Sequence, residues 1–400
     1  MVVVAPSVPF DAVPHAGGLY LLRLTRILED GADLTVLVPN TPTNRAGVAE
    51  PGAPRVTKVV GGGGPRTWRR RAGARALDVL DRRWRRWQPG LPSLPFAAAL
   101  RRPGPALDAL RAADTIDLEW SESIRLAGWV RRLNPDARLL GTFHDVQSQL
   151  FSREPAPRLV DRLFWRWAAR VARRHEREGV AALDEAWVFS EKDALLLGGA
   201  DHIVVVPPPL ATGVEQPRAD APPHPPTVLF VANLARAEND AGARWLLTDI
   251  WPAVRRQRPD ARLRIVGVGA SSTLRTLAAG CDEVTLAGYV ADLEPEYAAA
   301  WAVVVPLLQG AGVKFKTIEA LLHGVPTVTT SVGAEGVGGA DLFAGLTGDP
   351  HGIAAALVHA LQAPHDLCER SARALHLTRA TYGLDAFTET VRAAYRLDQA

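Results

Sequence analysis

The residue types with the clearest capacity for chemistry lie in one short stretch, residues 306–324, which reads PLLQGAGVKFKTIEALLHG. Lys314 and Lys316 follow a glycine turn there, although the whole chain has only four lysines against 42 arginines. A glycine turn that opens a helix presents free N–H groups and the positive end of the helix dipole, which favour phosphate. Compact ammonium charges on flexible stems add to such a site. The stretch predicts an anion-binding turn, although two solvated lysines in an ordinary strand–helix connection would look the same.

The flanks of this stretch supply the elements that would hold such a turn. Residues 301–305 and 327–330 are short β-branched runs of the kind found in buried parallel strands. Between them, apolar residues recur at helical spacing from Val313 to Leu322, and Gly324 is placed to end the helix. The same alternation continues through the second half of the chain. Further strands are expected at residues 227–233, 263–267 and 284–287, and helices at residues 239–258 and 293–301.

The first half shows the same alternation, with two candidate groups at the ends of strands. Gly17 and Gly18 separate a strand-like run at residues 2–9 from a helix-like run at residues 19–28, and glycines there let a ligand approach the backbone. His144 directly follows a strand-like run, which is where doubly wound sheets bind ligands, although a lone histidine is more often structural. The remaining strands are expected at residues 34–39, 115–120, 138–143, 186–190 and 203–206.

A proline-rich segment divides the chain into two similar halves. Residues 207–226 contain eight prolines, which is typical of a semi-rigid linker. Strands that alternate with helices on both sides predict a parallel sheet in each half. We therefore expect an α/β protein with two Rossmann-like, doubly wound domains that face a central cleft, at residues 1–206 and 227–380.

The net charge of +3 hides an asymmetry between the halves. Residues 1–200 carry 30 basic and 22 acidic side chains, whereas residues 201–400 carry 16 basic and 21 acidic ones. The first half is therefore expected to meet an anionic partner or a membrane surface. Two segments interleave arginine with tryptophan, a pattern that suits either an anionic lipid surface or a solvated face over a core stripe. We favour the solvated face for residues 162–177 and leave both interpretations open for residues 67–111.

Composition bears on the compartment of the protein. No apolar run reaches the ~18–20 residues that span a bilayer, and no signal peptide is expected at the N-terminus. The two cysteines lack metal-ligand spacing and suit a reducing compartment. The four glycines at residues 61–64 lack the Gly-Lys-Ser/Thr of a P-loop. We expect a cytoplasmic protein, with peripheral contact at the inner membrane face if the basic first half binds anionic lipid.

The second half resembles a known family. The runs VLFVANLARAENDAGARWLLTDIWPAV, RLRIVGVG and VTLAGYVADLEPEYAAAWAVVVPLLQGAGVKFKTIEALLHGVPTVTTSVGAEGV are similar in order and spacing to retaining GT-B glycosyltransferases of family four, the glycosyl transferases of group one. The match is strong over about residues 227–340 and weaker at PHAGG, TFHDV and WVFSEKD. The resemblance implies an acceptor-side first domain and a last helix, within residues 381–400, that crosses back to it.

The resemblance also implies roles for individual residues. His144, Arg236 and Lys316 match the catalytic positions, of which the first touches the transferred sugar and the others the diphosphate. Glu319 matches the glutamate that holds the nucleotide ribose. The other donor-binding positions are Gly17, Gly18, Gly310, Gly312, Val313 and Lys314. The implied reaction moves a sugar from a nucleotide-diphosphate sugar to an acceptor hydroxyl with retention, and needs neither a cofactor nor a metal. The acceptor would be a small molecule, a glycan or a glycolipid.

Two departures from the family pattern leave alternatives open. Ala311 stands where the family often has a second glutamate, and Asn239 lies near the place of a usual lysine. Asp117 and Glu119, in the run DLE, resemble a metal motif of another glycosyltransferase fold only superficially. A nucleotide-sugar epimerase on the same fold, or a non-catalytic nucleotide-sugar-binding protein, would share most of these features. Nucleic acid is not an expected partner, because no helix-turn-helix, zinc or single-strand-binding pattern is present.

Overall fold

The structure is a computed structural model, and it describes residues 1–11, 16–61, 81, 93–154, 156–210 and 224–397. The chain separates into two compact units. Unit 1 comprises Met1–Pro209 and Phe387–Ala400, and unit 2 comprises Leu210–Ala386. Most of the arginine- and tryptophan-rich segment 67–111, and three of the four glycines at 61–64, fall outside the described residues.

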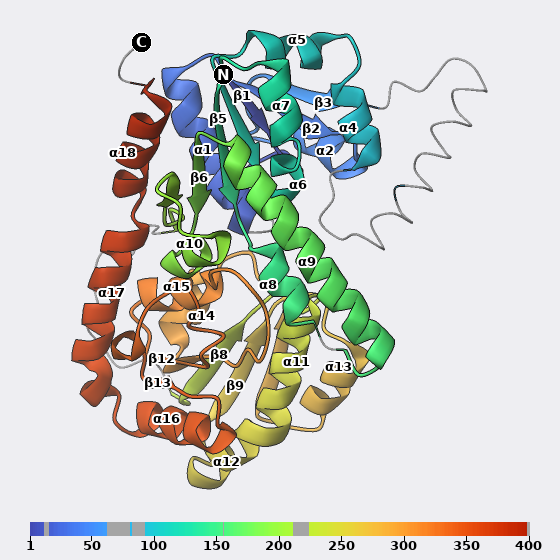
Figure 1. The fold of residues 1–400 in the computed structure, drawn as a ribbon. Helices are drawn as coiled ribbons and strands as arrows, with labels where there is room; N and C mark the ends of the chain where they lie inside the picture. Colours follow the sequence, from blue (N-terminus) through green and yellow to red (C-terminus); the bar gives the residue numbers. More distant parts are fainter. Residues whose placement is uncertain (12–15, 62–80, 82–92, 155, 211–223, 398–400) are drawn as a thin grey trace. The chain divides into compact units, whose positions relative to one another are not determined.

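Unit 1 is built on a seven-stranded sheet in which every pairing is parallel (Figure 1). Its order is β3-β2-β1-β4-β5-β6-β7, which is the doubly wound arrangement with one extra edge strand. The central strands are buried on both sides, as their β-branched composition predicts. The strands are β1 (Val2–Val4), β2 (Thr35–Pro39), β3 (Thr57–Val60), β4 (Thr115–Glu119), β5 (Arg138–Phe143), β6 (Glu185–Val188) and β7 (Ile203–Val205).

Ten labelled helices accompany this sheet in the described residues. They are α1 (Ala16–Gly31), α2 (Pro42–Gly47), α4 (Leu94–Leu100), α5 (Pro105–Ala112), α6 (Trp120–Ile124), α7 (Ala127–Leu133), α8 (Gln147–Ser152), α9 (Leu159–Ala182), α10 (Glu191–Leu197) and α18 (Leu384–Tyr395). Helix α18 belongs to unit 1 from Phe387 onwards. The hydroxyl of Tyr395, at its end, donates to Oδ2 of Asp117 in β4 over 2.8 Å. The last helix is thus tied to the centre of the first sheet.

Unit 2 repeats the arrangement with six parallel strands in the order β10-β9-β8-β11-β12-β13. The strands are β8 (Thr227–Val231), β9 (Arg262–Val266), β10 (Val284–Gly288), β11 (Ala302–Val305), β12 (Thr327–Thr329) and β13 (Gly345–Leu346). The α-helices are α11 (Ala237–Trp245), α12 (Trp251–Gln257), α13 (Ser272–Ala279), α14 (Glu294–Ala299), α15 (Phe315–Leu322), α16 (Pro350–Gln362) and α17 (Cys368–Tyr382). Two α/β units with parallel sheets confirm the predicted fold class.

Some predicted elements differ in the structure. The single helix expected at residues 239–258 is α11, then a π-helical turn at Leu246–Ile250, then α12. Pro252 explains the interruption, because proline has no N–H to donate to the preceding turn. No local pattern indicated β13, which has two residues, or β3, whose residues are mostly half-buried at the sheet edge.

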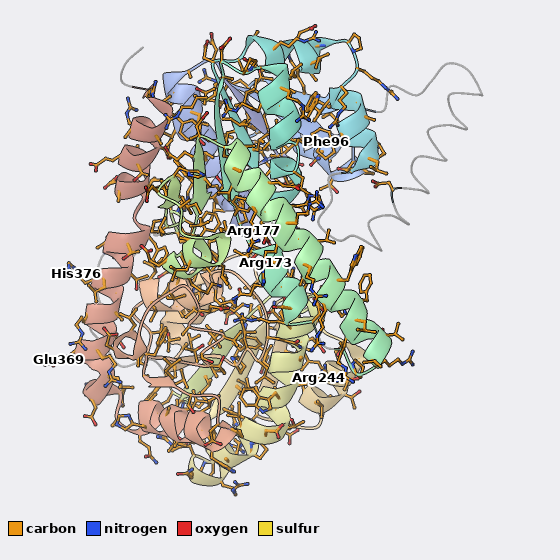
Figure 2. The ribbon with its side chains drawn as sticks, viewed as in Figure 1. Phe96, Arg173, Arg177, Arg244, Glu369 and His376 are labelled. Carbon is orange, nitrogen blue, oxygen red and sulfur yellow. The ribbon has the colours of Figure 1, made fainter. Side chains whose placement is uncertain are left out.

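Helix α9 shows which of its sides is solvated. The arginines predicted to share one face are all exposed, and Figure 2 labels two of them, Arg173 and Arg177. The exposed set is Arg162, Arg166, Arg170, Arg173 and Arg177. Small residues, among them Ala168 and Ala172, form the buried side instead and pack with Phe151 of α8. Leu163 and Trp167 are 57% and 41% exposed. The arginine face is therefore exposed, as expected, but Leu163 and Trp167 are exposed beside it and form no core stripe under it.

Candidate functional site

In each unit the candidate residues lie beside the strands at which the strand order reverses. The reversal falls between β1 and β4 in unit 1 and between β8 and β11 in unit 2. Ligands of doubly wound sheets bind beyond the carboxyl ends of the strands at this point. Gly17 follows β1 and His144 follows β5, while Arg236 follows β8 and Lys316 follows β11. Each unit therefore presents its candidates at the edge where its fold favours a ligand.

The turn between β11 and α15 adopts the conformation that its glycines predict. Gly310 and Gly312 have φ angles of 133° and 70°, in the left-handed region that other residues rarely enter. Lys314 is the N-cap residue of α15 and is 7% exposed. Its ammonium group donates to the carbonyl oxygens of Ala311, at 2.9 Å, and Gly312, at 2.5 Å. It also lies 3.7 Å from a carboxylate oxygen of Glu335. Lys314 thus fixes the shape of the turn from inside.

Lys316 has a different setting, because its partner comes from another helix. Its Nζ donates to Oδ1 of Asn239 in α11 over 2.7 Å. The Asn239 amide is oriented by its own Nδ2, which donates to the carbonyl oxygen of Asn233 over 2.7 Å. Helix α11 can reach the turn because Gly242 has no side chain; a Cβ there would lie 2.5 Å from the carbonyl oxygen of Pro306. The structure therefore brings Lys316 and Asn239 together from positions 77 residues apart.

The charge of Lys316 is poorly supported in this setting. Burial lowers the pKa of Lys316, and the positive charges of Arg236 and Lys314 add to this effect, so that the pKa is about 7. Arg236 and Lys314 disfavour a charge on Lys316, which marks a region of positive potential. A bound anion would lower the repulsion between these charges. Arg236 itself is largely exposed, and its Nε donates to Oε1 of Glu238 over 2.6 Å. Arg236, Lys314 and Lys316 thus form one cationic group around the turn.

Glu319 lies one helical turn after Lys316 and faces an aromatic pair. Burial raises the pKa of Glu319. Burial also raises the pKa of Tyr297 well above its usual value, and the nearby Glu319 carboxyl raises it further. The Tyr297 ring stacks on His323, with centroids 4.1 Å apart and planes 18° from parallel. Val313, the remaining candidate of this turn, is 8% exposed and packs as an apolar residue.

In unit 1, the structure brings Gly17 and His144 together. The imidazole of His144 stacks on the indole of Trp120, with ring centroids 3.7 Å apart and an interplanar angle of 8°. Trp120 holds a φ of 66°, which is rare for a bulky residue and persists only where its surroundings fix it. A Cβ at position 17 would lie 2.9 Å from Cζ2 of Trp120 and 3.2 Å from Nδ1 of His144. Gly17 is needed here for close approach. Gly18 is the next residue of α1 and is buried.

Behind the imidazole lie two buried carboxyl groups from β4. Oε2 of Glu119 is 2.6 Å from Nε2 of His144, and Glu119 and Asp117 are both 0% exposed. Burial raises the pKa of Glu119 to about 8 and raises that of Asp117 well above its usual value. Burial lowers the pKa of His144 to about 3, so that the imidazole is neutral at physiological pH.

Sequence reasoning missed three residues that the structure places in these groups. In the sequence, Glu119 stands only in a weak metal motif, and Asn239 only near the place of a usual lysine. Trp120 carried no signal in the sequence, because its stacking on His144 depends on the alignment of β4 with β5.

Among the described residues, no three side chains of His, Cys, Asp or Glu gather into a metal-binding group. None of the described helices is both long and apolar enough to span a membrane.

Comparison with known proteins matches the second unit to a family. Residues 225–363 match the model of the family "Glycosyl transferases group 1". A relative from Klebsiella pneumoniae, described as an uncharacterized 44.6 kDa protein in the cps region, is 34% identical over 122 residues. That alignment covers 29% of this chain and 31% of the relative, so less than a third of either protein is matched.

Solved structures are similar over the whole chain. HepE of Anabaena, in complex with UDP and glucose, has a TM-score of 0.64 at 12% identity and covers 100% of this chain and 99% of its own. Sucrose-phosphate synthase of Thermosynechococcus elongatus has a TM-score of 0.66 at 19% identity, with 99% and 98% covered. At these identities the likeness shows the fold alone. The chain therefore has the two-unit GT-B fold of glycosyltransferase structures, and residues 225–363 within it match the group 1 glycosyl transferases.

Proposed function

We propose that the protein is a glycosyltransferase that moves a sugar from a nucleotide-diphosphate sugar to an acceptor hydroxyl group. The observation that carries this proposal is the cationic group of unit 2. Lys316, held by Asn239 in the first turn of α15, lies in the field of Arg236 and Lys314. The match of residues 225–363 to the group 1 glycosyl transferases supports a nucleotide-sugar ligand for this group.

The chemistry follows from where charge develops. Departure of the diphosphate places negative charge on its oxygens and leaves oxocarbenium character on the sugar. Lys316, Arg236 and the free N–H groups at the start of α15 are suited to stabilise that charge, at ~3 kcal/mol for each preorganised donor. Lys314 contributes by holding the carbonyl groups of Ala311 and Gly312, and with them the shape of the turn that presents those N–H groups. With Arg236, Lys316 and the N–H groups at the start of α15 on the diphosphate, we propose a reaction without a metal.

The remaining candidate residues complete the donor assignment. Glu319 would hold the ribose hydroxyls, and Val313 would pack under the nucleotide. In unit 1, His144 would contact the transferred sugar, and the turn at Gly17 and Gly18 would lie near the donor phosphates. Retention of configuration is proposed from the family resemblance, with a donor phosphate oxygen that receives the acceptor proton.

The ligands of structures with the same fold suggest which donor to test first. One HepE structure is a complex with UDP and glucose, and a second is a complex with UDP-glucose. We propose a uridine-diphosphate sugar as the first donor to test. The acceptor is proposed to be a small molecule, glycan or glycolipid, because the proposed chemistry requires only a hydroxyl group. The protein is proposed to need no cofactor and to act in the cytoplasm.

The test is a thermal-shift screen against nucleoside diphosphates and nucleotide sugars, followed by turnover with the stabilising donor. A ligand at 100 times its Kd adds about 2.7 kcal/mol to the folded state, which is readily measured. Donor consumption should then require an acceptor and persist in EDTA. Isomerisation of the donor without an acceptor would identify an epimerase instead. Binding without turnover across an acceptor panel would identify a non-catalytic binding protein.

Helix α9 supports a proposal about location. Leu159 and Val160 are 63% and 74% exposed, and Leu163 and Trp167 are also exposed, next to the solvated arginines. Apolar and basic residues that interleave on one helix suit the surface of an anionic membrane. We propose peripheral binding there. Vesicles with anionic lipid should co-sediment with the protein, and the double variant Leu163→Ser/Trp167→Ser should remain in the supernatant.

A further inference from the structure

A row of buried polar side chains runs behind the imidazole of His144, and the proposed transfer reaction makes no use of it. Nε2 of His144 lies 2.6 Å from Oε2 of Glu119, and the hydroxyl of Tyr395 donates to Oδ2 of Asp117 over 2.8 Å. Glu119 and Asp117 lie two residues apart on the buried strand β4. The row ends at the imidazole ring of His144, which the proposed function places in contact with the transferred sugar.

The Glu119 carboxyl group is in a setting that favours its protonated form. Both Glu119 and Asp117 are 0% exposed. Oε1 of Glu119 and Oδ1 of Asp117 have no hydrogen-bond partner among the described residues. An ionised carboxylate that is buried with an unsatisfied oxygen is costly, and two adjacent carboxylates are more so. Burial accordingly raises the pKa of Glu119 to about 8.

The state of the carboxyl group decides which ring nitrogen of His144 carries the proton. A neutral imidazole has one N–H, and the hydrogen bond at one nitrogen fixes the role of the other. A protonated Glu119 donates to Nε2, so that the ring proton lies on Nδ1. Nδ1 is on the side of Gly17, where an added Cβ would lie 3.2 Å from it.

We infer that Glu119 is a positioning residue, whose carboxyl group fixes the His144 ring against Trp120 and keeps the ring proton on Nδ1, as a hydrogen-bond donor beside Gly17. The inference rests on the proposed function, in which a sugar hydroxyl oxygen accepts this hydrogen bond. The stacking of the ring on Trp120 restrains its plane, and the 2.6 Å contact restrains its rotation in that plane.

The same arrangement makes the donor role depend on pH. When Glu119 loses its proton to solvent, Nε2 must donate to the new carboxylate, and the ring proton moves from Nδ1 to Nε2. Nδ1 then becomes an acceptor and no longer donates to the sugar. The donor form therefore exists below the pKa of Glu119 and is lost as the pH rises through about 8.

Two buried tyrosines that face this pair do not titrate in the same window. Burial raises the pKa values of Tyr20, in α1, and Tyr395, in α18, well above the usual value, so both stay neutral. Burial also raises the pKa of Asp117 well above its usual value, and the Oδ2 atom of this residue accepts from Tyr395. Glu122, in α6, opposes the effect of burial on the pKa of His144 but is the lesser cause. Glu119 is the carboxyl group that lies at Nε2 of His144, so its titration acts directly on the tautomer.

Nuclear magnetic resonance of the unliganded full chain tests the inference without any substrate. Ring ¹⁵N and ¹³C shifts report the tautomer of a histidine, and the His144→Asn variant identifies the His144 signals among those of the ten histidines. We expect the Nδ1–H tautomer at pH 6.5 and a change to Nε2–H above pH 8. Glu119→Gln, whose amide N–H can still donate to Nε2, should keep Nδ1–H throughout. An Nε2–H ring in the wild type at pH 6.5, or the same transition in Glu119→Gln, would overturn the inference.

A second test measures how kcat/KM for the donor depends on pH. Loss of the Lys316 proton lowers kcat/KM above about pH 7 in every variant, and loss of the Glu119 proton should add a second fall of about tenfold for each pH unit above about 8 in the wild type. Glu119→Gln should keep the first fall and lack the second. Glu176→Gln, another buried carboxyl that accepts from the Ser148 N–H in the same unit, is the matched control and should keep the wild-type profile. If no donor is consumed, the proposed function fails while the tautomer result stands; if transfer occurs with equal profiles for wild type and Glu119→Gln, the inference fails alone.

Discussion

Nζ of Lys316 lies 2.7 Å from Oδ1 of Asn239, and this hydrogen bond joins the first turn of α15 to the first turn of α11. The two helices follow β11 and β8, the strands between which the order of the second sheet reverses. An amide oxygen satisfies an ammonium group without neutralising it, so the positive charge remains available to an anion. The contact therefore explains how the Lys316 side chain is held in place while its positive charge can still bind a diphosphate.

Removal of the Lys316 ammonium group should lower turnover more than stability. We expect Lys316→Ala to reduce kcat by about 10²-fold or more, because one preorganised charge-stabilising donor is lost. Single-turnover rates at saturating donor measure this effect. Lys58→Ala is the matched control, because Lys58 donates to the carbonyl oxygen of Pro105 in the other unit. Wild-type rates in Lys316→Ala would exclude a role for this lysine on the diphosphate.

A carboxylate in place of the Asn239 amide should weaken diphosphate binding more than removal of the amide does. In Asn239→Asp, the new negative charge would pair with Lys316 and compete with the diphosphate. We expect a Kd for the nucleoside diphosphate about tenfold higher or more, in line with ~1.5–3 kcal/mol for hydrogen bonds to charged groups. Asn239→Ala, which only frees the ammonium group, should weaken binding less. Equal losses in the two variants would mean that Asn239 acts by packing and not by leaving the charge available.

The low pKa of Lys316 predicts proton uptake when a diphosphate binds. Burial holds the pKa at about 7, so the amine is mostly neutral at pH 8, and a bound anion favours its charged form. We expect an uptake approaching about one proton at pH 8, decreasing towards pH 6, where the lysine is already charged. Calorimetry in two buffers with different ionisation enthalpies measures this number. Lys316→Met should abolish the uptake, and an unchanged value in that variant would assign the proton to another group.

Glu319 should act on binding before it acts on catalysis. We expect Glu319→Ala to raise the Kd for the free nucleoside diphosphate about tenfold, the effect of ~1.4 kcal/mol, while saturated turnover changes less. Calorimetry with the diphosphate makes the comparison. Glu294→Ala is a suitable control, because Glu294 is an exposed neighbour whose carboxylate contacts Nε2 of His323 at 3.0 Å. Equal effects of the two substitutions would point to general electrostatics and not to ribose recognition.

A methyl group at position 17 should disturb the stacked pair behind it. The Cβ of Gly17→Ala would lie 2.9 Å from Trp120 and 3.2 Å from His144, so one of the two rings must shift. We expect a fall in turnover of about 10–100-fold, because small displacements of positioned groups have effects of this size. Gly128→Ala is the control; the nearest atom to its Cβ, in the Arg132 side chain, is 3.8 Å away. Its turnover should match the wild type, as should its melting temperature to within a few degrees.

The general architecture was predictable from local patterns. Short β-branched strands, glycines at their carboxyl ends and apolar helical spacing have local causes, so they indicated two parallel sheets and the turn before α15. The contacts between side chains that lie far apart in the sequence could not be predicted in this way. The sequence cannot show that Lys314 turns inward to the carbonyl oxygens of Ala311 and Gly312 while Lys316 turns towards Asn239, since that depends on how α11 packs over the turn. The pairing of Glu119 with His144 depends on the register of β4 and β5.

The hydrogen bond between Tyr395 and Asp117 also has a consequence for folding during synthesis. Unit 2 is one continuous segment, Leu210–Ala386, whereas unit 1 is completed by residues that leave the ribosome only after unit 2. Domains generally fold as they emerge. The first unit must therefore wait, with the Asp117 carboxyl group lacking its tyrosine donor, while the second unit is synthesised. The buried row behind His144 is consequently among the last parts of the protein to be assembled, and a nascent chain that lacks its last helix holds an incomplete first unit.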